Sequence, residues 1–315
     1  MKVLLTIDVE TYSGDYEGDV NAGGAGLPFI LDQLDEHGLR ATFFVEALGA
    51  LRWGEHGIQN ICAQINQRSH EIQLHLHPEV AVPEGIGPAR SHMHSFSRND
   101  QEVLMINGLR ILHECGVDSI VSFRAGDLAA NADTIKAMAN VGLCISSNRD
   151  MDTKSSISSH INQLFPIVND ISMYRDVIDL PVSTMRSYLP FDGKYRHLNL
   201  TAVSYKEMES SIVKMLNSGY RCCTILTHPQ EFYYNVNGKI FKNLKNCRRL
   251  QKLLTFIANK SELSVMTVSE CNRKDVPLIM PPELNLNVYF SYFRLITQGL
   301  HRALMLIHKL NFRKN

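Results

Sequence analysis

The sequence predicts an α/β fold in which about seven or eight strands alternate with helices, as in a (β/α) barrel or a doubly wound sheet. Short apolar runs with period-two spacing recur along the 315 residues, and longer stretches with helical spacing separate them. The polar residues that could carry chemistry fall where the predicted strands end. They are Asp8, Glu10, His75, His77, Arg124 and His228. Parallel α/β folds place their sites at that edge, so we expect one site there.

The composition argues against several classes of protein. The 32 basic and 32 acidic residues balance, so the total charge gives no indication of nucleic-acid binding. The seven cysteines are scattered and show no CxxC spacing, which favours reduced thiols over a disulfide framework or a zinc ribbon. Met1 leads directly into a strand without a signal-peptide pattern. No apolar run reaches the ~20 residues that a membrane span requires. We therefore expect a cytoplasmic protein.

The first predicted strand, residues 3–10, ends in two carboxylates. Apolar residues alternate along it with a second set that includes Asp8 and Glu10, so these two side chains share one face. A buried carboxylate is costly unless a cation or hydrogen bonds compensate. Either residue alone could cap a loop or pair with an arginine. Both together, near a strand with metal-binding character, favour a functional site.

The next elements lead from this strand to the third. Residues 12–26 are polar and glycine-rich, and we expect a loop there. Their glycines lack the GxGxxG or GK[ST] spacing of a phosphate-binding loop. Pro28 falls in the first turn of a helix predicted for residues 27–37. Residues 41–45 form the second predicted strand, and residues 58–68 a helix.

The third predicted strand carries the clearest signal for a metal site. Its residues alternate between apolar and polar in the order Ile72, Gln73, Leu74, His75, Leu76, His77. His75 and His77 therefore project from the same, non-core face, and Pro78 ends the strand beyond them. Two imidazoles on one face at the end of a strand suit a metal ion. The alternative is a pair of polar-face histidines that only hydrogen-bond.

Two excursions interrupt the alternation of strands and helices. The first, residues 83–99, contains a second His-x-His pattern, His92 and His94, in a polar stretch with little apolar alternation. We expect these two histidines on the substrate side of the site or in solvent, and rank them below the strand histidines as metal ligands. The second, residues 147–176, is too long for a simple connection. Both excursions are expected at the rim, where they would set specificity.

The remaining chain continues the alternation to residue 268. Helices are predicted for residues 100–115, 131–141, 205–217 and 241–259, and strands for residues 119–124, 143–146, 177–181, 222–228 and 263–268. Arg124 ends one of these strands, and His228, followed by Pro229, ends another. Both residues thus join the predicted edge.

These motifs together resemble those of the NodB-homology polysaccharide deacetylases, carbohydrate esterase family 4. Five segments occur in the order of the family. They are TIDVE at residues 6–10, ATFFV at 41–45, SHEIQLH at 69–75, FRAG at 123–126 and ILTH at 225–228. The resemblance covers roughly residues 1–270. The histidine strand looks especially like a divergent, signal-free branch of that family.

The resemblance implies a distorted (β/α) barrel of about seven strands in residues 1–276. It also implies hydrolysis of N- or O-acetyl groups on sugars with a divalent metal, for which zinc is the favoured ion. Asp8 matches the base that activates the metal-bound water, and Arg124 matches the residue that holds this base. His228 matches the general acid that protonates the leaving nitrogen. His75 matches the first metal-binding histidine.

The sequence departs from the family pattern at the other metal ligands. The position after the base, usually an acid, is Val9, and the acid here is Glu10. The second metal histidine usually stands four residues after His75, where this chain has Glu79. His77 is the substitute, because it shares the strand face of His75. The expected ligands are therefore Glu10, His75 and His77, with Glu79 as a further candidate.

A C-terminal tail, residues 277–315, differs in composition from the barrel. Apolar residues recur there at helical spacing, at Phe293, Ile296, Leu300, Leu304 and Ile307. No acidic residue follows Glu283, so the tail is basic. We expect an amphipathic helix whose apolar face packs on the barrel or on a second subunit of a homo-oligomer. The alternative is peripheral contact with the anionic inner face of a membrane, which would suit a lipid-linked substrate.

The resulting hypothesis is a cytoplasmic metal-dependent deacetylase. Its substrate would be an N-acetylated sugar of a surface-glycan precursor, linked to a nucleotide or a lipid. A metal-bound water, a base and an acid in different environments are what amide hydrolysis requires. Two alternatives stay open. One is an amide hydrolase on the same fold that acts on a formyl sugar or a cyclic amide, and the other is a non-catalytic glycan-binding or assembly component.

Overall fold

The computed structural model describes residues 1–11, 13–82, 86, 92–149, 151, 161–167, 169–189 and 195–299. Its strands are β1 (Lys2–Val9), β2 (Thr42–Glu46), β3 (Glu71–Leu76), β4 (Ser122–Ala125), β5 (Ile145–Ser146), β6 (Ser172–Tyr174), β7 (Val177–Asp179), β8 (Thr184–Arg186), β9 (Tyr195–His197), β10 (Cys222–Thr227), β11 (Tyr233–Val236), β12 (Lys239–Lys242) and β13 (Ser264–Val265). Seven of them run parallel in the order β10-β1-β2-β3-β4-β5-β7. The predicted distorted barrel of about seven strands is thus confirmed.

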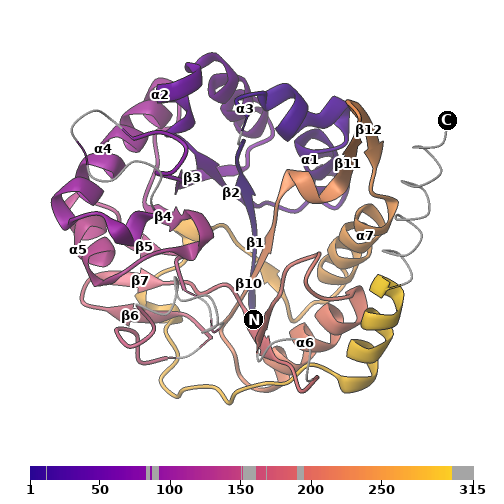
Figure 1. Cartoon of the computed structure of the whole chain (residues 1–315). Coiled ribbons are helices and arrows are strands. Elements are labelled where there is room, and N and C mark those ends of the chain that lie inside the picture. Colours follow the sequence, from indigo (N-terminus) through magenta and orange to yellow (C-terminus); the bar gives the residue numbers. More distant parts are fainter. Residues whose placement is uncertain are drawn as a thin grey trace.

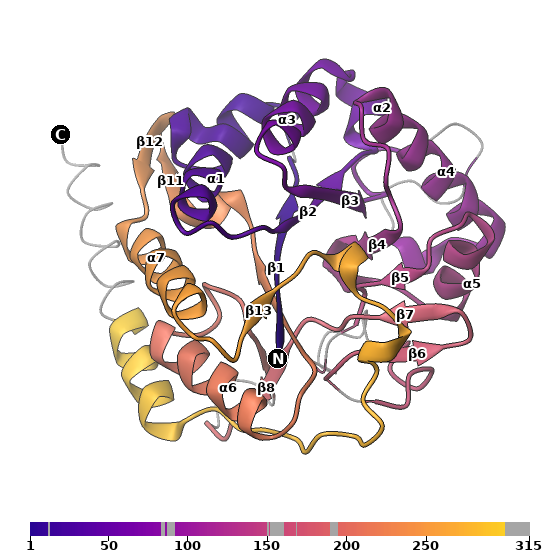
Figure 2. The same ribbon diagram turned by 180° about the vertical axis from the view of Figure 1, so that it is seen from behind.

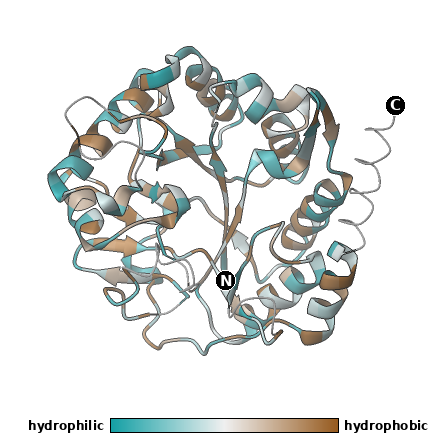
Figure 3. Ribbon diagram, in the orientation of Figure 1, coloured by the Kyte–Doolittle hydropathy of each residue, from teal (hydrophilic) through white to brown (hydrophobic). Residues whose placement is uncertain are grey.

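Helices surround this curled sheet on its outer side (Figures 1 and 2). They are α1 (Leu27–Glu36), α2 (Gly49–Trp53), α3 (His56–Gln67), α4 (Arg98–Glu114), α5 (Ala132–Asn140), α6 (Tyr205–Asn217) and α7 (Leu244–Ala258). Local signals set where they begin: Asn131 and Ser204 each form a capping box at the start of α5 and α6. Hydrophobic and hydrophilic residues alternate along the helices (Figure 3), as expected for elements with one face on a core.

Both faces of β3 are buried, which corrects the expectation that the histidines lie on a non-core face. Leu74 and Leu76 point toward α4, where Gly108 leaves room for them. A Cβ atom on Gly108 would lie 2.8 Å from Leu74 Cδ1 and 2.7 Å from Leu76 Cδ2. His75 and His77 are nevertheless also buried, because the curled sheet encloses the opposite face. The polar face of the strand therefore lines the interior of the barrel.

Some elements differ from the sequence-based expectation. Residues 12–26 are not one loop, since Glu17–Asn21 and Ala22–Gly24 form short helical turns. The helix predicted from residue 241 begins only at Leu244, because residues 239–242 pair with β11 as a hairpin. Asn243 caps this later start by accepting a hydrogen bond from the backbone N–H of Asn246. The antiparallel strands β6, β8 and β9 are likewise not predicted by the sequence pattern.

The structure also bears on the predicted state of the cysteines and on the predicted absence of a membrane span. All seven cysteines are free, as predicted, and five are buried, whereas Cys144 is exposed. In the part of the chain that the structure describes, we find no helix of the length and apolarity needed to cross a membrane. The two predicted excursions, residues 83–99 and 147–176, lie partly outside the described residues.

The described part of the tail packs against the barrel through Leu286, which is buried in the core, and through polar residues of the helix that follows it. Residues 288–299 form a helix beside α6 (Figures 1 and 2). Arg294 and Ser291 are its buried residues, whereas Phe293 and Ile296 are exposed. Packing of the apolar face on the barrel is therefore wrong for these two positions, whereas packing on a second subunit stays a prediction. The other predicted apolar positions, Leu300, Leu304 and Ile307, lie outside the described residues.

Candidate active site

Four strands, β10, β1, β3 and β4, bring the predicted site residues to one edge of the sheet. Asp8 is the second-to-last residue of β1, and Glu10 follows that strand directly. The other residues come from the ends of β3, β4 and β10, and they are His75, His77, Arg124 and His228. Because β1 lies between β10 and β2, its two carboxylates face residues from both directions. The structure thus brings all six together.

Glu10, His75 and His77 form a buried group that could hold a metal ion. One ligand atom from each residue lies within 4.8 Å of the others. The Glu10 Oε2 atom is 2.6 Å from His77 Nε2 and 3.5 Å from His75 Nε2. One carboxylate and two imidazoles are a donor set that zinc accepts, and three protein ligands leave a fourth position open.

The other ring nitrogens of the two histidines are held by hydrogen bonds. His75 Nδ1 lies 2.8 Å from the backbone carbonyl oxygen of Arg124, which can only accept a hydrogen bond, so Nδ1 is the donor and Nε2 is the nitrogen that faces Glu10. His75 Nε2 is buried and has no hydrogen-bond partner among the described residues. His77 Nδ1 lies 2.6 Å from Glu79 Oε1. A carbonyl or carboxylate behind the imidazole is the usual second shell of metal-binding histidines. The residues present therefore fit a metal ion, and Glu79 lies behind His77 rather than beside Glu10.

Two further residues shape the space around His77. Gly126 follows β4, and a Cβ atom there would lie 2.4 Å from His77 Nδ1 and Cε1. Only glycine leaves room for the imidazole at this position. Glu46, at the end of β2, accepts hydrogen bonds of 2.8 Å from the backbone N–H groups of Leu48 and Gly49. It also accepts one of 3.4 Å from the N–H of His77, which fixes the backbone of that residue.

The charges in the group support ligand character for Glu10. Burial by itself would raise the pKa of the Glu10 carboxyl, but the neighbouring imidazoles of His75 and His77 lower that pKa well below its usual range. Burial likewise opposes a charge on His77, yet hydrogen bonds with Glu10 and Glu79 raise the pKa of His77 well above its usual value. Glu10 is therefore a carboxylate, the form in which it can bind a cation.

Asp8 is held by a fully buried arginine. Arg124 Nη1 donates to Asp8 Oδ1 at 2.5 Å, and both Nη atoms lie 3.1 Å from the hydroxyl of Thr6. Nη2 also donates to the hydroxyl of Ser147 at 2.7 Å. The guanidinium lies over the ring of Phe44, with its carbon 4.2 Å from the ring centroid. These contacts fix one oxygen of Asp8 and leave Oδ2 on the side of His228.

His228 lies opposite Asp8 and reaches the surface. Its Nε2 atom is 4.0 Å from Asp8 Oδ2, and its Nδ1 atom is 3.1 Å from Glu231 Oε1. Burial would lower the pKa of His228, but Glu231, and then the charges of Asp8 and Glu10, raise it to about 9. Thr227 donates to the other oxygen of Glu231 at 2.7 Å and so holds that carboxylate in place. The His228 side chain is 26% exposed, which gives a substrate access to it.

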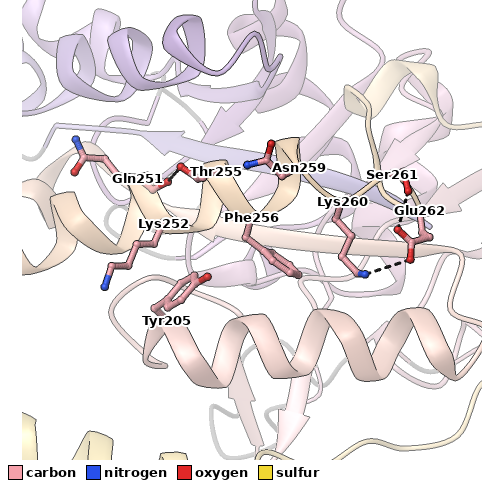
Figure 4. Close-up of a pocket in the computed structure, with 9 residues that line it drawn as sticks. All are labelled: Tyr205, Gln251, Lys252, Thr255, Phe256, Asn259, Lys260, Ser261 and Glu262. Carbon is pink, nitrogen blue, oxygen red and sulfur yellow. Dashed lines mark hydrogen bonds and ion pairs between the residues drawn. The ribbon is translucent and has the colours of Figure 1, made fainter.

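An open groove of about 480 Å³ adjoins these residues. It is lined by Glu10, Thr201, His228, Gln230, Glu231, Tyr233, Tyr234, Asn243 and Asn246. A different pocket of about 500 Å³, shown in Figure 4, lies on the outer surface along α7 and contains none of the site residues. The groove beside Glu10 and His228 is therefore the one through which a substrate would reach the site.

A second group of potential ligands lies at the rim, behind His77. Glu79, His92 and Asp127 also bring ligand atoms within 4.8 Å of one another, but they are partly or fully exposed. His92 Nε2 is 3.0 Å from Asp127 Oδ2, and the ring of His94 stacks on that of His92 at a centroid distance of 6.0 Å. The structure thus places His92 and His94 at the rim of the site, outside the buried group of Glu10 and the two strand histidines.

Sequence reasoning missed three residues that shape the site. Glu231 stands three positions after His228, a spacing at which a carboxylate can reach back to an imidazole, so it could have been found. Glu46 could also have been found, because it is an acid at the carboxyl end of a predicted strand. Ser147 carries no local signal, since its bond to Arg124 depends on the pairing of β4 with β5.

Comparison with solved structures identifies the fold. A protein from Mycobacterium smegmatis, described as a polysaccharide deacetylase, aligns with a TM-score of 0.57 over 90% of this chain and 94% of its own, at 17% identity. The chain has the fold of the polysaccharide deacetylases. The 4-α-glucanotransferase of Thermococcus litoralis aligns with a TM-score of 0.52 at 12% identity over 91% of this chain, which spans only 42% of that enzyme.

A family 4 carbohydrate esterase from Streptomyces lividans, solved with acetate, covers 89% of this chain and 98% of its own at 12% identity, with a TM-score of 0.47. No protein-family model matches the sequence, and no curated protein matches it either. At these identities the likeness concerns the fold. The function therefore has to be argued from the site of this chain.

Proposed function

We propose that the protein is a metal-dependent carbohydrate deacetylase that removes the acetyl group from an N-acetylated sugar of a surface-glycan precursor. The observation that carries this proposal is the buried group of Glu10, His75 and His77 beside Asp8 and His228. A metal-binding group, a carboxylate and an imidazole meet at one edge, and this is the combination that amide hydrolysis needs.

The protein residues divide the work in this proposal. Glu10, His75 and His77 would hold a divalent ion, zinc by our proposal, which supplies Lewis acidity and lowers the pKa of water at its open position. Asp8 accepts the proton of the attacking water. Its Oδ1 atom stays bound to Arg124, so Oδ2 is the atom that takes the proton. The backbone carbonyl of Arg124 also orients His75.

His228 completes the reaction as the general acid. Its raised pKa of about 9 keeps the imidazole protonated at neutral pH, and Nε2 can give its proton to the leaving nitrogen. Glu231, on the Nδ1 side, holds the ring so that Nε2 faces Asp8. Base and acid are 4.0 Å apart, close enough to act on atoms of one amide group.

The groove next to the site supports a sugar as the substrate. Tyr233 and Tyr234 offer aromatic rings against which the apolar face of a sugar can pack, and Thr201 offers a hydroxyl for hydrogen bonding. Seven free cysteines favour a reducing compartment and hence a precursor on the cytoplasmic side of the membrane.

The metal content of the purified chain, made without a histidine tag, tests the metal part of the proposal. We expect about one zinc or similar ion per chain by mass spectrometry, as three protein ligands bind one ion. The His75→Ala variant should lose that ion. The matched control is His92→Ala, which removes a rim histidine and should leave the content unchanged. An absence of metal from wild type, even after reconstitution with zinc, would refute the proposed site.

Release of acetate from a panel of N-acetylated sugars, free and nucleotide-linked, tests the reaction. The panel includes formyl sugars and cyclic amides, since the same residues could hydrolyse those bonds. We expect acetate release to fall by about 10²-fold or more in His228→Ala. Unchanged rates on every active substrate would exclude the proposed acid. Faster release of formate than of acetate would assign the chain to deformylation.

A further inference from the structure

The helix formed by residues 288–299 is attached to the barrel by its polar side. Arg294 Nε lies 3.1 Å from Glu207 Oε1 and 3.0 Å from Glu207 Oε2, and all three of these atoms belong to fully buried side chains. Ser291 donates its hydroxyl to the same carboxylate at 2.7 Å. Removing one member of such a pair would leave a buried charge unpaired. The ion pair therefore fixes which side of the helix faces α6.

The opposite side of this helix carries large apolar side chains that are exposed. Tyr289 is 84% exposed, Tyr292 54%, Phe293 66% and Ile296 61%. The spacings of three and four residues between them place these side chains on one face of the helix, which we call the outer stripe. Single exposed apolar residues are ordinary, but a row of four on one fixed helix marks an interaction surface.

The sequence after the outer stripe indicates the kind of partner. Leu300, Leu304 and Ile307 continue its spacing in the sequence. No acidic residue follows Glu283, and the basic residues are Arg294, Arg302, Lys309, Arg313 and Lys314. Glu207 pairs with Arg294, and the other four follow the outer stripe in the sequence. A partner that binds this sequence therefore has to combine an apolar interior with a negatively charged surface.

We propose that the outer stripe and the basic segment after it bind an anionic phospholipid surface. Tyrosine and phenylalanine favour the boundary between headgroups and acyl chains, and lysine and arginine gain from the negative potential of that surface. A second copy of the chain fits less well. The outer stripe of a second copy is followed by the same basic sequence, so it offers no negative charge to match these cations. The inference does not depend on the deacetylase activity.

Co-sedimentation of the full chain with vesicles tests this proposal. We expect binding to vesicles of equimolar phosphatidylcholine and phosphatidylglycerol and much weaker binding to phosphatidylcholine alone. The double variant Phe293→Ser with Ile296→Ser should weaken binding at least about tenfold, because it removes two side chains from the apolar contact. Arg302→Gln with Lys309→Gln should weaken it about 25-fold, since each cation contributes about fivefold.

A matched control changes exposed apolar residues elsewhere. Val103→Ser with Ile106→Ser alters the exposed side of α4, on the other side of the barrel in Figure 1, and should bind vesicles like wild type. Circular dichroism and thermal unfolding check that each variant folds. Equal vesicle binding by wild type and both test variants would overturn the proposal.

Two other results would overturn it as well. Equal binding to the neutral and the anionic vesicles would remove the role of charge. A concentration-dependent dimer that Phe293→Ser with Ile296→Ser dissociates, together with no vesicle binding, would assign the outer stripe to a second copy. Acetate release from a water-soluble substrate, measured in parallel, should not change in this variant. A failure of the membrane proposal is thereby separated from a failure of the proposed reaction.

Discussion

Two buried arginine–aspartate pairs lie on the same sheet, and only one of them is arranged for chemistry. Arg149 Nε donates to Asp179 Oδ2 at 2.7 Å, and the hydroxyl of Ser146 donates to Asp179 Oδ1 at 3.0 Å. Both oxygens of that carboxylate are thus occupied. In the other pair Arg124 holds Asp8 Oδ1, while Oδ2 faces His228 at 4.0 Å.

The two pairs differ in the surroundings of the carboxylate oxygen that the arginine does not bind. Burial raises the pKa of Asp179 despite Arg149, and neither of its oxygens is left for another group, so that pair only joins β7 to the segment after β5. Asp8 has one oxygen fixed and one directed at an ionisable partner that reaches the groove. Of the two pairs, only that of Asp8 keeps an oxygen available for the proposed reaction.

The largest expected effect comes from making the two aspartates neutral in turn. Asp8→Asn keeps the shape of the side chain but removes the proton acceptor, so acetate release should fall by about 10²- to 10⁴-fold. Asp179→Asn should leave the rate per folded chain within about twofold. It should still lower the free energy of unfolding by about 3 kcal/mol, because Arg149 would remain buried without a counter-ion.

Denaturant unfolding and acetate release on both variants measure these effects. The distinction between the two pairs is wrong if Asp179→Asn loses as much activity per folded chain as Asp8→Asn does. It is sharpened if the two variants lose similar stability while only Asp8→Asn loses activity.

A smaller effect is expected from a substitution of Gly126. This substitution tests the positioning of the metal ligand His77 and leaves the base Asp8 unchanged. Gly126→Ala would place a methyl group 2.4 Å from the ring of His77, and the buried imidazole would have to move. We expect metal affinity to fall by about 10- to 100-fold, as for other changes behind a metal ligand. Titration of metal against a competing chelator measures it. Gly299→Ala is the control, since no atom of the described residues lies within 4 Å of a Cβ atom at that position, and equal affinities would contradict the role of Gly126.

The smallest expected effect is a displacement of the pH profile by Glu231→Gln. His228 donates only when protonated, so activity should be present below its pKa of about 9 and decline as the pH rises through that value. Losing the carboxylate removes an interaction that raises this pKa. The alkaline limb should move to lower pH by about one pH unit. Glu209→Gln, on the outer helix α6, should leave the profile in place, and an unmoved limb in Glu231→Gln would count against His228 as the acid.

The sheet and the six central site residues could be predicted because their signals are local. Alternation in residues 3–10 and 72–77 identifies strands, and parallel strands present their carboxyl ends together. The burial of the face of β3 that carries His75 and His77 could not be predicted from such local signals. It follows from the curl of the whole sheet, and alternation alone looks the same in a flat one-sided strand.

The orientation of the tail helix was unpredictable for a similar reason. Its amphipathic spacing predicts a helix correctly, but the usual rule that the apolar side faces the core fails here. The partner that decides the orientation, Glu207, lies 87 positions from Arg294 in the sequence. A buried ion pair of that kind leaves no local pattern, so only the folded chain shows it.

The central place of β1 has a consequence for how the protein is made. The hydroxyl of Thr6 donates to the carbonyl of Ile225, 219 positions away, and β1 pairs directly with β10. On a ribosome that adds roughly 5–20 residues per second, β1 therefore keeps one edge unpaired for on the order of ten seconds or more. Asp8 emerges among the first residues, whereas its acid partner His228 comes only after β10. No nascent or prematurely terminated chain that stops before this strand can assemble the complete site, however well its earlier strands have formed.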